Sequence, residues 1–321
     1  MTLIYISSPV HEVAITEAEK VGRVVLGYGP DAVDYSAVAS EVDAVFLRSG
    51  SFTDAMMEAS PRLRIIARHG VGTDTVDIPA AERRGIWVTN VPTGNARAVA
   101  EHVFAMVLSL ARKLGTAVEQ TRNGLWAEER PKLNGIELEG RTLGLLGQGN
   151  IGRRVADLGR AFGMKVIVTD PAMDQSLPGV VDFDTLLASS DVLSLHLPLL
   201  PSTRGIVDAT AIGKMKQGAI LINTGRGGLV DEMALADALR LGALGGAGLD
   251  VLDAENTDMV KPMPHNRLPI ADLPNLIVTP HVGGQTDEAL QRVGCATVDQ
   301  IRSALSGARP EFAVNNITQD A

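Results

Sequence analysis

Three polar side chains of reactive types follow three separate apolar segments in the second half of the chain. Arg226 follows the segment LINTG, Glu255 follows AGLDVLDA, and His281 follows LIVTP. Apolar segments of this length indicate buried β-strands. In an open parallel sheet the carboxyl ends of the strands meet at one edge, where ligands bind. We therefore expect these three side chains to face a common site.

These residue types suit the oxidation of a 2-hydroxy acid. An imidazole can take the hydroxyl proton near neutral pH as hydride leaves C2. A carboxylate beside it orients the ring and stabilises its protonated form. A guanidinium can hold the substrate carboxylate with two parallel hydrogen bonds and polarise the reacting carbonyl. Each residue also has a simpler interpretation: Arg226 as a loop contact to phosphate, Glu255 as a solvated acid and His281 as a packing residue at a strand end.

A glycine motif upstream indicates a dinucleotide site. Gly147, Gly149 and Gly152 stand in G-x-G-x-x-G spacing between the apolar segment TLGLL and the helix-like segment RRVADLGRAFG. The first glycine permits a tight turn, the second lets a pyrophosphate approach the backbone, and the third lets helix and strand pack closely. Asp170 ends the next apolar segment, where a carboxylate can accept both ribose hydroxyls and repels the 2′-phosphate of NADP. The sequence therefore predicts NAD as the cofactor.

Short apolar segments alternate with helix-like segments along the whole chain, which predicts a doubly wound α/β architecture. The predicted strands are apolar at both odd and even positions, as burial on both faces of a parallel sheet requires. They lie within 3–7, 23–29, 43–49, 63–70, 86–90, 143–147, 165–170, 191–198, 218–225, 246–252 and 276–281. A long helical span from about Ala98 is expected to bridge the two halves, and Thr286 is expected to be the N-cap of a last helix.

Composition disfavours several classes of protein. The chain has 321 residues and a formal net charge of −9, without a long run of Lys or Arg, so we expect no nucleic-acid or anionic membrane surface. Its single cysteine, Cys295, permits no intrachain disulfide. The N-terminus lacks a signal-peptide pattern, and no window approaches the roughly 18 apolar residues of a membrane helix. We therefore expect a cytoplasmic protein. The histidines lack metal-ligand spacing, so no metal is expected.

Several stretches of the chain, in their order and spacing, resemble the D-isomer-specific 2-hydroxyacid dehydrogenase family. The resemblance covers nearly the whole chain from about Leu63. The matching stretches are ARHGVGTDTVDIPAAERRGIWVTNVP, NARAVAEHVFAMVLSLARKL, GQGNIGRRVA, DVLSLHLPLLPST, INTGRGGLVDEMALADAL, GAGLDVLDAE and LPNLIVTPHVGG.

The resemblance implies roles for individual residues. The family's catalytic arginine, glutamate and histidine fall on Arg226, Glu255 and His281, with His281 as the acid and base. Backbone amides around Val71 and Gly72 would hold the substrate carboxylate, since glycines there let N–H groups form an anion nest. Further cofactor contacts fall on Asn150, Ile151, His196, Pro198, Thr203, Thr224 and Asp250.

The resemblance also implies the overall organisation. It predicts two doubly wound domains with a cleft between them: a flavodoxin-like substrate domain from 1–97 and 286–321, and a Rossmann NAD-binding domain from 98–285. Members are usually homodimers that act on a small 2-hydroxy or 2-oxo acid. The chain ends soon after the last predicted helix, so we expect none of the further C-terminal domains that some phosphoglycerate dehydrogenases carry.

Some alternatives stay open on the sequence alone. Arg48 and Arg68 end predicted strands, and in the phosphoglycerate dehydrogenases that this chain resembles, arginines in like positions receive the substrate phosphate. They could instead be structural salt-bridge partners, and His196 could be a simple strand-end residue. The alternatives to a 3-phosphoglycerate-like substrate are a hydroxypyruvate or glyoxylate reductase and, in another class, an NAD-sensing corepressor. The loop over 256–269 departs from the family's pattern and is expected to be a surface extension.

Overall fold

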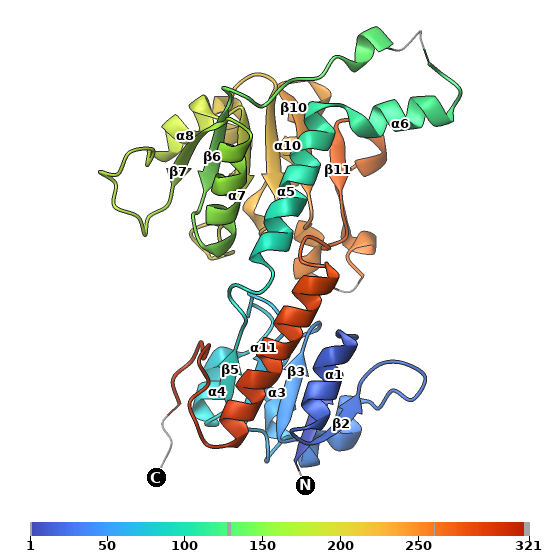
Figure 1. The fold of residues 1–321 in the computed structure, drawn as a ribbon, viewed down its shortest axis with the longest axis vertical. Helices are drawn as coiled ribbons and strands as arrows, with labels where there is room; N and C mark the ends of the chain where they lie inside the picture. Colours follow the sequence, from blue (N-terminus) through green and yellow to red (C-terminus); the bar gives the residue numbers. More distant parts are fainter. Residues whose placement is uncertain (1, 127–129, 260, 318–321) are drawn as a thin grey trace. The chain divides into compact units, whose positions relative to one another are not determined.

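The structure is a computed structural model that describes residues 2–126, 130–259 and 261–317. The chain forms two compact units: unit 1 is Met1–Asn95 with Gln285–Ala321, and unit 2 is Ala96–Gly284. Each unit is a parallel β-sheet with helices on both faces (Figure 1), which confirms the predicted α/β class with two doubly wound sheets. Residues 1 and 318–321 of the predicted substrate domain, and residue 260 of the predicted loop, lie outside the described residues.

Unit 1 contains a five-stranded parallel sheet in the order β2-β1-β3-β4-β5. This is the order of flavodoxin-like sheets, which bind ligands where the order reverses, between β1 and β3. The strands are β1 (Leu3–Ile6), β2 (Arg23–Leu26), β3 (Ala44–Leu47), β4 (Ile65–Arg68) and β5 (Trp87–Thr89).

Two hydrophobic cores cover this sheet. Along β3, Val45 and Leu47 face a core shared with α2, α3 and α4, whereas Ala44 and Phe46 face a core shared with α1 and α11. Successive strand residues point to opposite faces, so both kinds of position must be apolar. The helices are α1 (Glu12–Glu19), α2 (Tyr35–Val38), α3 (Asp54–Glu58), α4 (Ile78–Arg83) and α11 (Asp287–Leu305), with a short 3-10 helix, η1 (Ala39–Glu41).

The last helix, α11, completes the core on one face of unit 1. Its Val298 and Ile301 pack in the same cluster as Ile4 and Phe46 of the first strands. Thr286 caps the helix as predicted, because its hydroxyl accepts from the N–H of Ala289 at 3.2 Å.

Unit 2 contains a six-stranded parallel sheet in the order β11-β10-β9-β8-β6-β7. Val168 of β7 also forms an isolated parallel bridge with Val180. Counting that bridge as a short strand beyond β7 gives the order 3-2-1-4-5-6-7, which is the Rossmann order 3-2-1-4-5-6 with one more strand at its end and its reversal between β6 and β8. The strands are β6 (Thr142–Leu146), β7 (Lys165–Thr169), β8 (Val192–Leu195), β9 (Ala219–Asn223), β10 (Leu244–Leu249) and β11 (Leu276–Val278).

Helices cover both faces of this sheet as well. Leu143 and Leu145 of β6 face a core shared with α5 and α7, whereas Leu193 and Leu195 of β8 face a core shared with α8, α9 and α10. The helices are α5 (Ala96–Ala111), α6 (Leu114–Arg122), α7 (Asn150–Ala161), α8 (Phe183–Ser189), α9 (Ala209–Lys214) and α10 (Glu232–Arg240), with 3-10 helices η2 (Arg130–Leu133), η3 (Gly227–Leu229), η4 (Asp253–Asn256), η5 (Met263–His265) and η6 (Ile270–Asp272).

The long helical span expected from about Ala98 is interrupted. It consists of α5, which begins where the chain enters unit 2, and α6, with a break at Lys113, whose φ of 50° is left-handed. The carbonyl of Ala111 accepts from the N–H of Ile136 at 2.8 Å and not from the next helical turn. The expected long span is therefore two helices, and both belong to unit 2.

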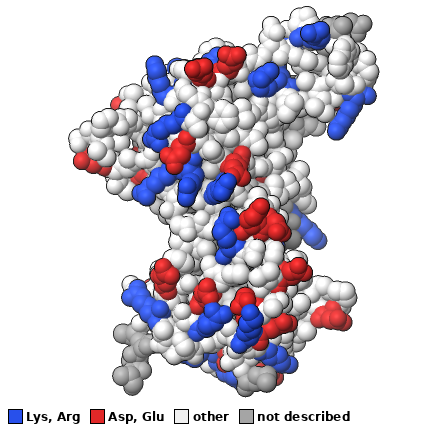
Figure 2. Space-filling model, viewed as in Figure 1, with Lys and Arg blue, Asp and Glu red and all other residues white. Residues whose placement is uncertain are grey.

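The surface of the molecule mixes both signs of charge. On the face shown in Figure 2, Lys and Arg side chains are interspersed with Asp and Glu side chains over both units. Among the described helices, none combines the length and the apolar character needed to cross a membrane.

Candidate active site

His281 and Glu255 form a close pair in unit 2. Nδ1 of His281 lies 2.7 Å from Oε2 of Glu255. The histidine side chain is 45% exposed, whereas that of Glu255 is 13% exposed. The carboxylate of Glu255, the more buried of the two groups, therefore orients the more exposed ring of His281 through Nδ1. The other ring nitrogen, Nε2, is the atom that can exchange a proton with a reactant.

The short helix η4 positions Glu255. Oε1 of Glu255 accepts from the N–H of Leu252 at 2.9 Å, while Oε2 pairs with His281. Both carboxylate oxygens are thus engaged, and the side chain is fixed in one orientation. The next amide, that of Asp253, donates to Oε1 of Glu232 at 2.7 Å.

Asp250 organises the turn that carries His281. Its side chain is 2% exposed. It accepts from the hydroxyl of Thr279 at 2.6 Å, the N–H of Val282 at 2.8 Å and the N–H of Gly283 at 2.7 Å. Nε2 of His102 lies 3.0 Å from the same hydroxyl. Burial by itself would raise the pKa of Asp250, but these hydrogen bonds outweigh burial and hold the pKa below its usual value.

The backbone of His281 is held in a left-handed conformation. Its φ is 54°, a region that costs an L residue roughly 1–2 kcal/mol. Its N–H donates to the carbonyl of Asp250 at 2.9 Å. Strain of this kind persists only where surrounding contacts impose it, and it concentrates at functional sites.

Arg226 lies in a glycine-rich loop that packs against the segment before η4. The carbonyl of Arg226 accepts from the side-chain amide of Asn223, and Nη1 of Arg226 donates to the carbonyl of Gly225, both at 2.8 Å. A Cβ on Gly227 would overlap the carbonyl carbon of Leu252. The loop therefore approaches the Glu255 segment more closely than any side chain would allow.

The three predicted catalytic side chains follow three neighbouring strands. Arg226 follows β9, Glu255 follows β10 and His281 follows β11, and these strands are adjacent and parallel. All three residues lie at the carboxyl edge of one sheet, the edge at which open α/β sheets bind their ligands. The structure pairs Glu255 with His281 directly, and it joins the Arg226 loop to the Glu255 segment through close backbone packing.

The glycine motif meets the steric demands of a dinucleotide loop. Gly147 has a φ of 95°, which favours glycine. A Cβ on Gly149 would meet no atom within 4 Å, so a ligand can reach the backbone there, whereas one on Gly152 would overlap the carbonyl oxygen of Gly147. α7 starts directly after Gly149, so its unpaired N–H groups face this space.

Asp170 lies beside the glycine loop. One carboxylate oxygen accepts from the N–H of Gln148 at 2.8 Å and the other from the N–H of Ala172 at 2.9 Å. The carboxylate is therefore oriented before any ligand binds, and a carboxylate oxygen can accept a further hydrogen bond.

The other predicted cofactor residues include the start of α7 and the segment after β8. Asn150 and Ile151 are the first residues of α7. Nε2 of His196 lies 3.0 Å from the hydroxyl of Ser194, and burial lowers the pKa of His196 to about 4. The hydroxyl of Thr203 donates to the carbonyl of Pro198 at 2.7 Å, which closes the turn after β8.

Thr224 supplies a further sign of a ligand site. Its Oγ1 is buried and has no hydrogen-bond partner among the described residues, and such atoms are rare in native structures. An orphaned hydroxyl and an open backbone at Gly149 are features that a bound NAD would satisfy.

Of the two arginines predicted to bind substrate in unit 1, Arg48 directly follows β3 and Arg68 is the last residue of β4. Nη1 of Arg48 donates to the carbonyl of Pro9, and Nη1 of Arg68 donates to the carbonyls of Arg48 at 2.5 Å and His69 at 2.7 Å. These hydrogen bonds go to backbone carbonyls. The alternative hypothesis, that both arginines are salt-bridge partners, predicted contacts to carboxylates instead.

The predicted anion-binding loop is oriented by a side chain from the next strand. Val71 is exposed, and its carbonyl accepts from the side-chain amide of Asn90 at 2.7 Å. Because the peptide group is planar and trans, the N–H of Gly72 points the opposite way.

The sequence argument did not include three residues that make hydrogen bonds around the site: Thr279, His102 and Glu232. Thr279 lies two residues before His281 and Glu232 soon after Arg226, and that proximity is the one signal that could have marked them. The contact of His102 with Thr279 spans 177 residues of sequence, so it becomes visible only in the folded chain.

Comparison with known proteins identifies the family of the chain. Residues 104–283 match the sequence model for the NAD-binding domain of D-isomer specific 2-hydroxyacid dehydrogenases. The D-3-phosphoglycerate dehydrogenase of Mycobacterium leprae is 41% identical over 293 residues, which are 89% of this chain and 54% of that protein. The hydroxypyruvate reductase of Thermotoga maritima is 43% identical over 267 residues, which are 82% of this chain and 85% of that protein.

A solved structure agrees with this. The D-lactate dehydrogenase of Aquifex aeolicus, complexed with NAD and lactic acid, has a TM-score of 0.82 and 32% identity, covering 95% of this chain and 96% of that one. The chain spans about half the length of the mycobacterial relative. Because more than half of its residues match the model of the family's NAD-binding domain, this chain belongs to the D-isomer specific 2-hydroxyacid dehydrogenase family.

Proposed function

We propose that this chain is an NAD-dependent D-2-hydroxyacid dehydrogenase in which His281 is the acid and base. The observation that carries the proposal is the 2.7 Å contact between His281 Nδ1 and Glu255 Oε2. That pair belongs to the same parallel sheet as the glycine loop after β6. Family membership supports the class of reaction.

The residues of the site suit each proton and charge of that reaction. Nε2 of His281 takes the proton of the C2 hydroxyl during oxidation and returns it to the carbonyl oxygen during reduction. Glu255 stabilises the imidazolium through Nδ1–H. Arg226 holds the substrate carboxylate and polarises the oxygen on C2. NAD, when bound, supplies the hydride acceptor, and its reduced form supplies the donor.

The first experiment follows the loss of NADH absorbance with a panel of 2-oxo acids. His281→Ala is expected to lower kcat/KM by roughly 100- to 10,000-fold, the usual contribution of a general acid or base. His265→Ala, on an exposed histidine after β10, is the matched control and is expected to match wild type. Retention of full activity by His281→Ala would refute the assignment. Saturable NADH binding without turnover of any 2-oxo acid would favour a binding protein over an enzyme.

We further propose that the substrate carries a second anionic group on C3, as 3-phosphoglycerate does. The name of the mycobacterial relative supports this, and so do the positions of Arg48 and Arg68 at the carboxyl ends of β3 and β4. The competing proposal is a hydroxypyruvate reductase, as in the Thermotoga relative. The structure adds that both guanidinium groups already donate to carbonyls, so a substrate phosphate would use their remaining donors.

Comparing 3-phosphohydroxypyruvate with hydroxypyruvate separates these substrates. If Arg48 receives the phosphate, Arg48→Ala lowers kcat/KM for the phosphorylated acid by at least about tenfold and spares the plain acid, since a charged hydrogen bond contributes roughly 1.5–3 kcal/mol. Arg64→Ala, whose guanidinium donates to the carbonyl of Leu305, is the control. Equal losses on both acids would return Arg48 to a structural role.

The resemblance also supports a homodimer. The mass of the purified protein in solution, compared with the 33.8 kDa of one chain, tests the assembly, and a monomeric mass at working concentration would contradict it.

A further inference from the structure

We propose that Glu232 is a positioning residue for the His281–Glu255 pair and that it acts by holding the amide of Asp253 at the start of η4. This inference rests on the proposed function, because it assigns one more role within the same site.

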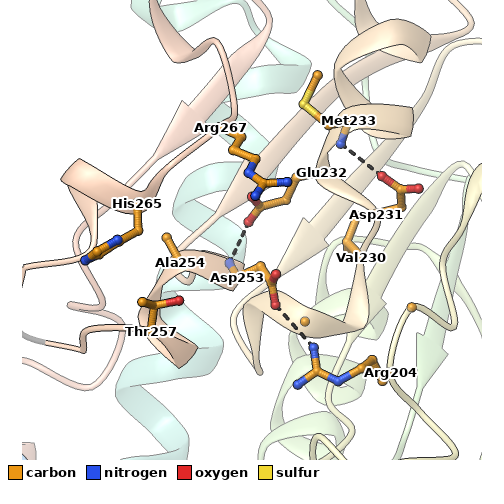
Figure 3. Close-up of a pocket in the computed structure, with 12 residues that line it drawn as sticks. Arg204, Val230, Asp231, Glu232, Met233, Asp253, Ala254, Thr257, His265 and Arg267 are labelled. Atoms are coloured by element: carbon orange, nitrogen blue, oxygen red, sulfur yellow. Dashed lines mark hydrogen bonds and ion pairs between the residues drawn. The ribbon is translucent and has the colours of Figure 1, made fainter.

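Glu232 reaches away from its own helix. It is the first residue of α10, and the N-cap of that helix is Asp231, whose carboxylate accepts from the N–H groups of Met233 and Ala234. The helix start is therefore already satisfied. Oε1 of Glu232 instead accepts from the N–H of Asp253 at 2.7 Å, as Figure 3 shows.

The amide that Glu232 holds belongs to the segment on which the active site depends. The N–H of Leu252 donates to Glu255, and the next N–H, that of Asp253, donates to Glu232. Two carboxylates thus fix two successive amides. The same peptide group is the one against which Gly227, next to Arg226, packs without room for a Cβ. Movement of this peptide would displace Glu255, and with it the ring of His281.

Glu232 lies on the wall of a cavity of about 420 Å³ in unit 2, on which the side chains of Asp253 and Arg267 also lie (Figure 3). The charged or titratable groups that line the cavity with it are Asp231 from its own helix, Asp253 from η4, Arg204 from the turn after β8, and His265 and Arg267 from the loop after β10. Burial raises the pKa of Glu232, and the negative charges of Asp253, Glu255 and Asp231 raise it further. The hydrogen bond from the N–H of Asp253 lowers the pKa, but it does not offset these effects. A carboxylate kept among other carboxylates is costly for stability, which points to a functional use.

Two substitutions separate the hydrogen bond from the charge. Glu232→Ala removes the acceptor and is expected to lower kcat/KM by roughly tenfold, the loss of one hydrogen bond to a charged group, with the KM for NADH unchanged. Glu232→Gln keeps an acceptor oxygen for the Asp253 amide and is expected to restore kcat/KM to within about twofold. Asp237→Ala, on an exposed residue of the same helix that pairs with Arg240, is the matched control and is expected to behave as wild type.

The pH profile distinguishes positioning from mere structural support. Glu255 favours the protonated imidazole that reduction requires only while η4 holds it against the ring. Glu232→Ala, which releases the Asp253 amide, therefore shifts the alkaline limb of kcat/KM for reduction to lower pH, whereas Glu232→Gln and Asp237→Ala leave it in place. A structural role alone would lower the unfolding temperature without moving this limb. If Glu232→Ala fails to fold, the limb of Glu232→Asp, whose shorter side chain withdraws the acceptor from the amide, decides the question.

The failure of this inference is distinguishable from the failure of the proposed function. Suppose that wild type turns over a 2-oxo acid, that kcat/KM of Glu232→Ala lies within about twofold of wild type, and that the alkaline limb does not move. This result would overturn the role of Glu232 and leave the proposed dehydrogenase activity intact. Absence of wild-type turnover would overturn the proposed function. In that event the histidine NMR titration of wild type and Glu232→Ala still tests the coupling: a changed midpoint for the His281 ring supports it, and an unchanged one refutes it.

Discussion

At the scale of single residues, the predicted catalytic histidine depends on neighbours that hold its backbone and not its ring. The left-handed backbone of His281 is maintained by Asp250, which accepts hydrogen bonds from both residues that follow, and by Thr279 and His102 behind it. These contacts fix the turn before the imidazole meets Glu255. The direction of the ring is thus set by buried polar groups, which stabilise a conformation only when all of them are satisfied.

Thr279→Val tests this arrangement. The substitution keeps the shape of the side chain but removes the hydroxyl that donates to Asp250 at 2.6 Å. We expect a loss of roughly 1–3 kcal/mol in the free energy of unfolding, because a buried carboxylate loses a donor, together with a higher pKa for Asp250. A fall in kcat/KM of roughly tenfold should accompany it if the His281 turn relaxes. Urea unfolding and steady-state kinetics measure the two effects.

Thr210→Val, at an exposed position on α9, serves as the control for that experiment. A Thr279→Val protein with the stability and activity of this control would mean that the turn is held without the hydroxyl.

Sequence reasoning could reach residues whose role follows from position, but not residues whose role follows from contact. Arg226, Glu255 and His281 each stand after an apolar segment, and the parallel sheet brings their positions to one edge. Their roles in catalysis stay predictions. His102 lies in the middle of an apolar helix and carries no local signal, because its partner Thr279 is 177 residues away.

At the scale of elements, two loops behave as one unit. The glycine-rich segment at η3 and the segment before η4 come from different strands, but Gly227 lets their backbones touch at Leu252. Gly227→Ala is expected to push the segments apart and to lower kcat/KM by at least about 100-fold, since a displacement of about 1 Å at a catalytic group has this effect. Steady-state kinetics with the preferred 2-oxo acid measure it.

Gly213→Ala provides the contrast, because a Cβ there would meet nothing within 4 Å and the residue lies in α9. It should gain roughly 0.5–1 kcal/mol of stability with unchanged activity. Equal activity of the two alanine variants would show that the two loops are not coupled.

The strands were easier to predict than the helix boundaries. Each strand is apolar on both parities because each face meets its own core, as Val45 and Phe46 illustrate on β3. The break at Lys113 could not be predicted, because it depends on the hydrogen bond between Ala111 and Ile136, which lie 25 positions apart. The hydrophobic period of a segment predicts which of its faces is buried. It does not predict which carbonyl will accept a hydrogen bond from an amide far away in the sequence.

At the scale of the whole molecule, each unit contains a histidine that is kept neutral. Burial, aided by the charges of Arg48 and Arg68, lowers the pKa of His69 in unit 1 to about 4, and burial lowers that of His196 in unit 2 to about 4. The unfolded chain protonates these rings near pH 6.5, whereas the folded chain resists protonation. Stability is therefore complete above about pH 6.5 and falls as the pH decreases toward 4, by roughly 3 kcal/mol for His69.

Hydrogen exchange of the β3 and β4 amides, measured between pH 7 and pH 4, reports the stability of unit 1. In His69→Gln the free energy of opening should vary less steeply with pH than in wild type, even if its value at pH 7 is lower, because the ring also stacks on Phe46. The same slope in both proteins would show that His69 does not contribute to acid sensitivity.

The order in which the chain contributes to its two units has a consequence for its synthesis. The apolar face that includes Ile4 and Phe46 is covered by Val298 and Ile301 of α11, and all of unit 2 is translated between them. On the ribosome, one apolar face of the sheet formed by residues 1–95 therefore stays uncovered until α11 is translated. Unit 2 emerges before that point and can fold first. A nascent chain stalled once Gly284 has left the exit tunnel should therefore yield a protease-resistant 96–284 fragment and a degraded N-terminal segment. Unit 1, whose strands precede unit 2 in the chain, is thus completed only after unit 2 has been translated.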